Sequence, residues 1–275
     1  MSLGPYIRRR PSASLYFQYA LVCLIVLAPI AWMVEASFKA PTAVTAYPPQ
    51  LFFTPTLENY ATLFETTPFG QYALNSLIVA GGSTALGLLL GVPAAFAISY
   101  EAITWPATLT LAARMAPGTL FLLPWYIAFT ALGLVGSHTV LVLTHAVITM
   151  PLILWVMLPY FDGLPRDILE AARIDGCSPG RMFWRIALPL VRPGLVVATI
   201  LGFVFSWNYF LFALVLSGFD SKTLIVAAFN FIGEGATNWG ALMAAAVLIA
   251  LPPLLLSLLV QRWLVSGLTA GAVKG

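Results

Sequence analysis

The side chains of this sequence that could carry out chemistry are few and widely spaced. Cys23 and Cys177 stand 154 positions apart and form neither a redox pair nor a metal-binding spacing. His138 and His145 have no carboxylate companion at ligand spacing, so we interpret them as polar groups between helices. The one Lys followed by Ser or Thr is Lys222, and it lacks the preceding glycine of a phosphate-binding loop. The sequence therefore predicts no catalytic residues, no metal ligands and no ATP chemistry within the chain.

Charged side chains are instead concentrated in one segment, residues 161–192. It holds five Arg, three Asp and one Glu, out of 13 Lys and Arg and 10 Asp and Glu in the whole chain. Pro165 can open a helix, and Gly176 fits the left-handed position that closes one. Ser178 and Pro179 then have the pattern of an N-cap and first position of a second helix. We expect two short helices joined by a tight turn, too rigid for a simple tether.

This segment could bind either a protein or a lipid surface. Glu170 and Arg173 are three positions apart, where an ion pair would support the first helix. Ala171 and Ala172 give that helix a smooth surface suited to a groove on another protein, and Pro189 and Pro193 end the second helix. The arginines also suit an amphipathic segment lying on anionic lipid. Residue types leave docking and lipid contact equally open.

Outside this segment the chain is too apolar to fold in water. Hydrophobic residues make up 60% of the sequence and charged residues only 8%, against about 25% charged residues in an average soluble domain. So little charge would leave large apolar patches exposed. The composition excludes a soluble enzyme and a disordered chain, and a net charge of +3 is too small and scattered for a nucleic-acid binder. We predict an all-α membrane protein.

Six apolar segments are long enough to cross a bilayer core, which takes about 20 residues per helix. We expect them to form one domain, residues 1–275, with spans at 15–34, 71–100, 107–132, 138–160, 193–217 and 240–264. Gly133, Gly136 and Ser137 separate the third span from the fourth. Gly87 and Gly91 form a G-x-x-x-G pattern, which lets helix backbones approach closely.

The distribution of basic residues predicts the orientation. With the N-terminus inside, ten Lys and Arg residues lie in cytoplasmic segments and two, Lys39 and Lys222, lie outside. Both termini and residues 161–192 are then cytoplasmic. Arg114 is left over near the inner end of the third span, where it either snorkels to the interface or pairs with an acid of a partner. Residues 34–36 could mark a signal-peptide cleavage site, but the preceding apolar run of about 20 residues exceeds the usual ~7–15.

The predicted spans hold almost no ionisable groups at membrane depth, and such groups mark proton and ion pathways. Arg114 is the single candidate. A proton relay or a sodium-coupled carboxylate site is therefore poorly supported, and the energy for any transport must come from outside the chain. The charge-rich segment 161–192 is where that energy would enter.

The spacing within this segment resembles a known motif. Glu170-Ala171-Ala172 is followed by Asp175-Gly176 and, after nine residues, by Ile186-x-Leu188-Pro189. This pattern resembles the EAA loop of ABC importer permeases, in which the loop sits in a cleft of the ATPase subunit. The resemblance implies coupling to the ATPase through Glu170, Ala171, Ala172, Asp175, Gly176, Leu188 and Pro189.

Further segments resemble the second permease subunit of the carbohydrate importers of the maltose type. They are residues 37–39, 55–60, 75–76, Trp207-Asn208 and 267–275. Two positions depart from that family: Tyr209 stands where an acid is usual, and Glu101 and Trp105 stand where a basic cluster is usual. The first departure leaves the identity of the substrate in doubt.

The resemblance implies a transport subunit rather than an enzyme, in a bacterial or archaeal cytoplasmic membrane. Its expected partners are a second homologous permease, two ATPase subunits that bind ATP and Mg on the chain's behalf, and an extracytoplasmic solute-binding protein. The chain itself needs no cofactor, and residues 269–275 would reach the ATPase pair. We expect Trp207, Asn208 and Tyr209 to line a pathway without fixed charge for a sugar-like solute. The alternatives are a stand-alone secondary carrier or channel for a neutral polar solute and, with less support, a membrane-embedded enzyme.

Overall fold

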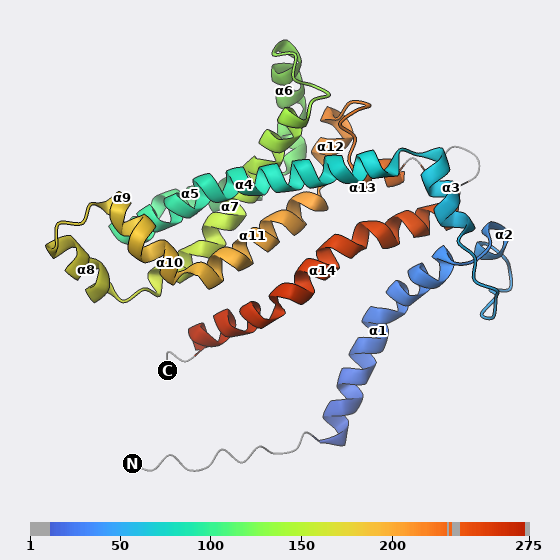
Figure 1. Cartoon of the computed structure of the whole chain (residues 1–275), viewed down its shortest axis with the longest axis horizontal. Coiled ribbons are helices and arrows are strands. Elements are labelled where there is room, and N and C mark those ends of the chain that lie inside the picture. The colour runs from blue at the N-terminus through green and yellow to red at the C-terminus, as the bar shows by residue number, and fades with distance from the viewer. Residues whose placement is uncertain (1–11, 230, 233–236, 273–275) are drawn as a thin grey trace. The chain divides into compact units, whose positions relative to one another are not determined.

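The computed structural model describes residues 12–229, 231–232 and 237–272, with side chains described as far as residue 259. The described part is helical, with no strand (Figure 1). In chain order the helices are α1 (Ala13–Ser37), α2 (Pro41–Val44), α3 (Glu58–Thr66), α4 (Phe69–Glu101), α5 (Trp105–Met115), α6 (Gly118–Ala131), α7 (His138–Asp162), α8 (Arg166–Ile174), α9 (Pro179–Met182), the π-helical turn η1 (Phe183–Ala187), α10 (Leu188–Leu190), α11 (Arg192–Trp207), α12 (Leu211–Leu216), α13 (Leu224–Phe229) and α14 (Trp239–Ala272).

The helices group into two compact units. One comprises Met1–Glu65 and Phe231–Val247, and the other Thr66–Asn230 and Leu248–Gly275. In the first unit, the Asn59 amide donates hydrogen bonds to the carbonyls of Ser37 (3.0 Å) and Lys39 (2.6 Å), which ties α3 to the end of α1. Lys39 is buried and pairs with Glu35 at 2.6 Å. Most apolar side chains of α1 are exposed, as expected for a helix whose surroundings are lipid or other helices.

In the second unit α4, α7 and α11 pack side by side (Figure 1). The G-x-x-x-G prediction is confirmed, because α4 and α7 approach closely at both glycines. A methyl group at Gly87 would lie 2.9 Å from the Thr149 hydroxyl oxygen, and one at Gly91 would lie 2.9 Å from the Met150 carbonyl oxygen. The Thr149 hydroxyl also donates to the backbone carbonyl of Ser83 at 3.0 Å. Small residues thus let the central helices share buried hydrogen bonds.

Four of the six predicted spans are single long apolar helices: α1, α4, α7 and the stretch Trp239–Leu259 of α14. The separation of α6 from α7 is also as predicted. Gly133 and Gly136 adopt φ values of +66° and +87°, which glycine tolerates. The Ser137 side chain caps α7 by accepting from the Val140 amide at 3.3 Å.

The prediction of continuous spans at 107–132 and 193–217 is wrong. The first divides into α5 and α6, because Pro117 has no amide to donate and Ala116 before it is extended (ψ 130°). The second divides into α11 and α12 around residues 208–210. Length and composition support four membrane-crossing helices in the described part, or five if the bent pair Pro179–Leu190 and Arg192–Trp207 forms one span.

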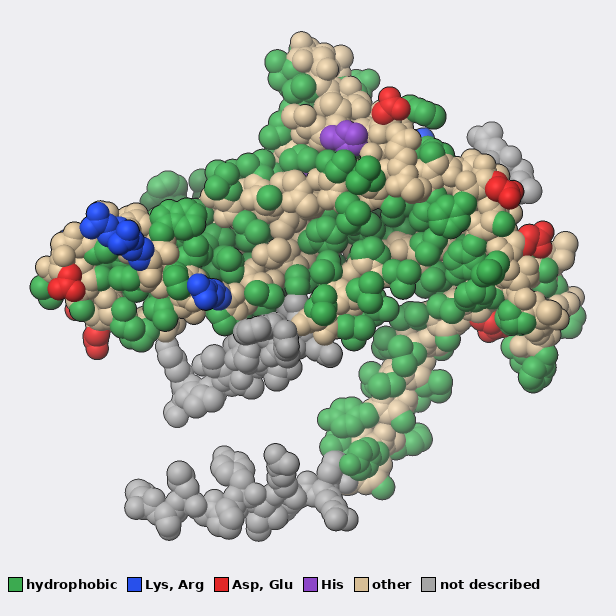
Figure 2. Space-filling view, in the orientation of Figure 1, with side chains coloured by type: hydrophobic (Ala, Val, Ile, Leu, Met, Phe, Trp, Pro, Cys, Tyr) green, Lys and Arg blue, Asp and Glu red, His purple; other side chains and the backbone are tan. Residues whose placement is uncertain are grey.

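The surface agrees with a membrane protein. Hydrophobic side chains cover most of the visible face of the second unit, and most of its visible Lys and Arg side chains lie at the end that carries α8 to α10 (Figure 2). Large apolar residues such as Leu89, Leu123 and Ile127 are more than half exposed. Such a surface requires lipid or partner subunits around it.

Candidate functional site

The segment 161–192 folds as two helical pieces joined by a tight turn, as its local sequence predicts. Helix α8 ends at a turn in which Gly176 adopts φ +76°. The Gly176 amide donates to the Arg173 carbonyl at 3.1 Å, and the Cys177 amide to the Ala172 carbonyl at 2.9 Å. The Ser178 hydroxyl then caps α9 by accepting from the Arg181 amide at 3.4 Å. The turn therefore depends on a backbone conformation that only glycine adopts freely.

Two details of this segment differ from the prediction. The second helix ends at Leu190, between Pro189 and Pro193, but Pro189 itself lies inside α10, which follows the π-helical turn η1. A π-turn widens the helix, which relieves the clash that proline otherwise makes with the preceding turn. Glu170 and Arg173 form no ion pair; in the part of the chain with described side chains the one salt bridge joins Glu35 and Lys39. Both side chains of the predicted pair are exposed to solvent instead.

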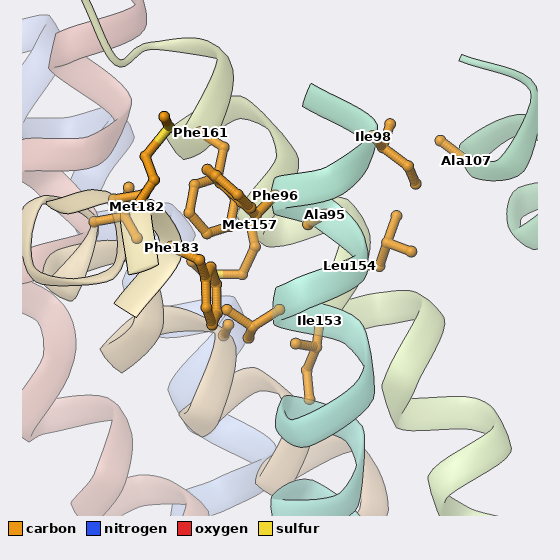
Figure 3. Packing of buried hydrophobic residues seen from close by; sticks show 14 of the residues in the cluster. Ala95, Phe96, Ile98, Ala107, Ile153, Leu154, Met157, Phe161, Met182 and Phe183 are labelled. Atoms are coloured by element: carbon orange, nitrogen blue, oxygen red, sulfur yellow. The ribbon is translucent and has the colours of Figure 1, made fainter. Parts of the chain in front are cut away.

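The inner face of this segment is anchored in the core of the second unit. Met182 is fully buried, and Phe183 packs at 5.3 Å between ring centroids on Phe96 of α4 (Figure 3). Phe96 in turn contacts Phe161 of α7 at 5.5 Å. Ala172 of α8 belongs to the same cluster. The side chains of α8 and α9 are therefore part of the same close-packed core as those of α4 and α7.

The outer face of α8 carries an exposed apolar stripe, which we define as Ile168, Ala171 and Ile174. These residues are three positions apart and so lie along one side of the helix. Ile174 is 86% exposed and Ile168 is 41% exposed. Ala172, which we predicted on the same smooth surface as Ala171, is buried. The stripe is an apolar surface without a partner inside the described part of the chain.

The remaining predicted coupling residues lie elsewhere in segment 161–192. Asp175 is exposed at the turn, and Leu188 and Pro189 are half-buried in α10. Glu170 lines a cavity of about 700 Å³ between α8 and the ends of α4 and α7. There the Ser99 hydroxyl donates to the Asp162 carboxylate at 2.5 Å. The predicted residues thus surround one end of the helical unit; their role in coupling remains a prediction.

A second feature lies where the break between α5 and α6 meets the break between α11 and α12. A cavity of about 890 Å³ is bordered by the end of α5, the start of α6, the middle of α7 and the break after α11. Its wall is mainly apolar and aromatic, with Phe121, Trp125, Phe205 and Phe212 among the lining residues. Hydroxyl groups from Thr110, Thr144 and Tyr209 add a few hydrogen-bonding positions. This combination is typical of sites for small organic molecules.

The three predicted pathway residues have different surroundings. Trp207 is buried, and its indole N–H donates to the Ile249 carbonyl of α14 at 3.0 Å, so it is placed to hold two helices together. Asn208 is exposed, and its amide donates to the Val204 carbonyl at 2.8 Å. Tyr209 alone of the three lines the cavity. Contact of any of them with a solute remains a prediction.

Sequence reasoning missed Arg114 as a cavity residue. It lies in the last turn of α5, directly before the break at Ala116, and its guanidinium carbon is 5.0 Å from the ring centroid of Phe205. This cavity carries a fixed charge, because Arg114 is on its wall; that the solute pathway is free of fixed charge remains a prediction. The signal was present in the sequence, since Arg114 and Arg262 are the two charged residues within the predicted spans and Arg262 stands near the end of its span.

Both histidines lie between helices or on helix carbonyls, as predicted. The Nε2 atom of His138 is 2.8 Å from the Oδ1 atom of Asn75 on α4. The Nδ1 atom of His145 is 2.7 Å from the Leu141 carbonyl oxygen, and the His145 ring packs edge-on against Tyr209. The described residues contain no group of three or more His, Cys, Asp or Glu that could hold a metal ion.

Comparisons with known proteins agree on one family. Residues 14–270 match the family described as "Binding-protein-dependent transport system inner membrane component". The trehalose/maltose transport system permease protein MalG of Thermococcus litoralis is 35% identical, over 93% of this chain and 94% of the relative. The sulfoquinovosyl glycerol transport system permease protein SmoH of Agrobacterium fabrum is 35% identical over 90% of this chain and 89% of its own length. The trehalose transport system permease protein SugB of Mycobacterium tuberculosis is 33% identical, with coverages of 93% and 95%.

A solved structure has the same fold. A chain of a bacterial ABC transporter involved in the import of the acidic polysaccharide alginate superposes with a TM-score of 0.75 at 20% identity. The match covers 92% of this chain and 99% of that chain.

Proposed function

Because the chain belongs to the binding-protein-dependent transport system inner membrane component family, whose members are transport subunits, we propose that it is one permease of an ATP-driven importer for a sugar or sugar-like solute. The names of its relatives support a sugar, since they include trehalose, maltose, sulfoquinovosyl glycerol and diacetylchitobiose transport systems. The chain is a multi-pass membrane protein of this family, and its similarity to sugar permeases supports a carbohydrate importer.

The observation that carries the proposal is the anchoring of segment 161–192. Its outer stripe, Ile168, Ala171 and Ile174, would seat in a groove of an ATPase subunit. Its inner face packs through Met182 and Phe183 on the core of α4 and α7. Closure of the ATPase pair on ATP would push α8 and move these helices as a body, because the intervening side chains are close-packed.

The remaining parts of the importer follow from this role. A second permease would complete the pathway, a solute-binding protein would deliver the sugar, and ATP and Mg would bind to the two ATPase subunits. Six spans, with α5–α6 and α11–α12 as broken spans, would place both termini and segment 161–192 in the cytoplasm of a bacterial or archaeal inner membrane. Broken helices near mid-membrane are a recurring way to build a transport site.

Site-directed cross-linking tests the docking. A single cysteine is placed by Ile174→Cys after Cys23→Ser and Cys177→Ser, and the complex is purified in mild detergent. We expect a cross-link from position 174 to a P-loop ATPase subunit, with a yield that changes on addition of ATP. The matched control is Leu132→Cys, an exposed apolar position (68%, against 86% for Ile174) outside segment 161–192. A cross-link from position 132 but not from 174 would overturn the proposed docking and orientation.

A further inference from the structure

The cavity between the broken spans holds a positive charge in an apolar wall. Its 20 lining residues include one charged side chain among the described residues, Arg114. In the described part of the chain, no carboxylate lies within 4.0 Å of this guanidinium. Its described neighbour is the Phe205 ring, at 5.0 Å. A cation–π contact orients the guanidinium but leaves its five N–H donors free for an acceptor.

The position of Arg114 makes its charge costly without an acceptor. It lies about 14 Å along the helix axis from the start of α5 at Trp105, and it borders the same cavity as residues 143–151 of α7. A cation at this depth of a membrane protein faces a water-filled cavity or pairs with an anion. Arg114 faces such a cavity. The planar fork of arginine fits a carboxylate or sulfonate in bidentate fashion.

Two neighbours add to the attraction for an anion. The start of α6 at Gly118 lies on the same wall, and the N-terminal end of a helix carries partial positive charge. Gly118 also leaves room for the Tyr209 hydroxyl, since a methyl group there would lie 2.7 Å from it. The charge, the helix start and this hydroxyl therefore border one volume.

We propose that this cavity binds a sugar carrying an acidic group, a carboxylate or a sulfonate, and that Arg114 is the residue that selects it. The acidic group binds the guanidinium, and the sugar ring lies against the aromatic wall formed by Phe121, Trp125 and Phe205. Tyr209 supplies a hydrogen bond to a hydroxyl. This inference rests on the proposed transport function and names its class of substrate.

A matched pair of glycosides tests the selection. The probes are 4-nitrophenyl β-D-glucuronide and 4-nitrophenyl β-D-glucopyranoside, which differ only in having a carboxylate or a hydroxymethyl group on the ring. Binding to the purified complex in lipid nanodiscs is measured by equilibrium dialysis, following nitrophenyl absorbance. We expect the glucuronide to bind about tenfold or more tightly, as a charge-assisted hydrogen bond implies. Its affinity should fall as salt is raised while that of the glucopyranoside stays constant.

Substitutions assign the preference to Arg114. In Arg114→Gln both probes should bind equally, whereas Arg114→Lys should keep a reduced preference because the charge remains. Arg192→Gln, which removes an exposed arginine outside the cavity, should behave as wild type. Equal binding of the two probes to the wild type, or an unchanged preference in Arg114→Gln, would overturn the proposal. If Arg114→Gln does not assemble, the salt dependence in the wild type decides in the same way.

Lipid could supply the same anionic chemistry, so the nanodiscs are made with phosphatidylcholine alone or with added phosphatidylglycerol. A glucuronide preference that holds in both supports a solute site. A preference that is lost when phosphatidylglycerol is added, or probe binding displaced by phosphatidylglycerol, assigns Arg114 to an anionic lipid headgroup and refutes the proposal. ATP-driven uptake is measured separately. Uptake independent of ATP would refute the importer function and leave the binding preference standing, whereas ATP-driven uptake without the preference would refute only the role of Arg114.

Discussion

Replacing Gly176 with alanine should uncouple ATP hydrolysis from transport while the protein remains folded in the membrane. Gly176 has φ +76° at the turn between α8 and α9, and no atom lies within 4 Å of the position that a methyl group would take. The cost of the substitution is therefore backbone strain alone, about 1–2 kcal/mol for an L-residue in the left-handed region. That strain lowers the ratio of native to rearranged turn by about 5- to 30-fold.

The readout is the number of solute molecules taken up per ATP hydrolysed in proteoliposomes that contain the whole complex. Gly176→Ala should lower this ratio several-fold with little change in the amount of assembled complex. Gly176→Asn should recover part of it, because asparagine tolerates the left-handed region better than alanine does.

Gly180→Ala is the matched control, since Gly180 also has open space around it but lies in α9 without a positive φ. Alanine there should be neutral or stabilise the helix by about 0.5–1 kcal/mol. Equal coupling ratios in Gly176→Ala and Gly180→Ala would refute the reasoning, because the two variants differ only in the conformation of the substituted residue.

Two further predictions concern packing and the cavity. Gly91→Ala should lower the melting temperature of the detergent-solubilised complex, because its methyl group would meet a backbone carbonyl of α7 at 2.9 Å. Gly81→Ala on the same helix is the control and should leave the melting temperature unchanged, because its methyl group meets nothing within 4 Å. Equal melting temperatures in the two variants would contradict the close approach of α4 and α7. Trp207→Phe should lower the melting temperature by removing the hydrogen bond to Ile249, worth about 1 kcal/mol, and should leave the apparent affinity for solute unchanged. Tyr209→Phe should weaken the apparent affinity for solute and leave the melting temperature unchanged. A change in solute affinity confined to Trp207→Phe would contradict this division of roles.

Local chemistry explains which features of segment 161–192 could be predicted. The caps of α8 and α9 depend on Gly176, Ser178 and Pro179 themselves, so their identities define the turn. Which face of α8 is buried depends on contacts with α4 and α7, and the sequence therefore could not assign Ala172 to the core. The course of the chain through Pro189 depends on the π-turn before it, which has no simple sequence signal.

The breaks between α5 and α6 and between α11 and α12 differ in how far the sequence could predict them. The break at Ala116–Pro117 had a local signal in the proline, but membrane helices also tolerate proline within a continuous span. The break at residues 208–210 contains neither glycine nor proline, and contacts from elsewhere accompany it: the His145 ring packs on Tyr209, and Trp207 bonds to α14. Only the three-dimensional arrangement therefore brings Arg114 and Tyr209 to the same cavity.

The most direct test of the account is the energy source of uptake. The purified complex is reconstituted in proteoliposomes, with the solute-binding protein on one side and ATP on the side that segment 161–192 faces. We predict that uptake requires both ATP on that side and the binding protein, and that it stops when the catalytic glutamate of the ATPase subunit is replaced by glutamine. Uptake driven by an ion gradient without ATP, from the isolated chain, would contradict the account and favour a stand-alone carrier.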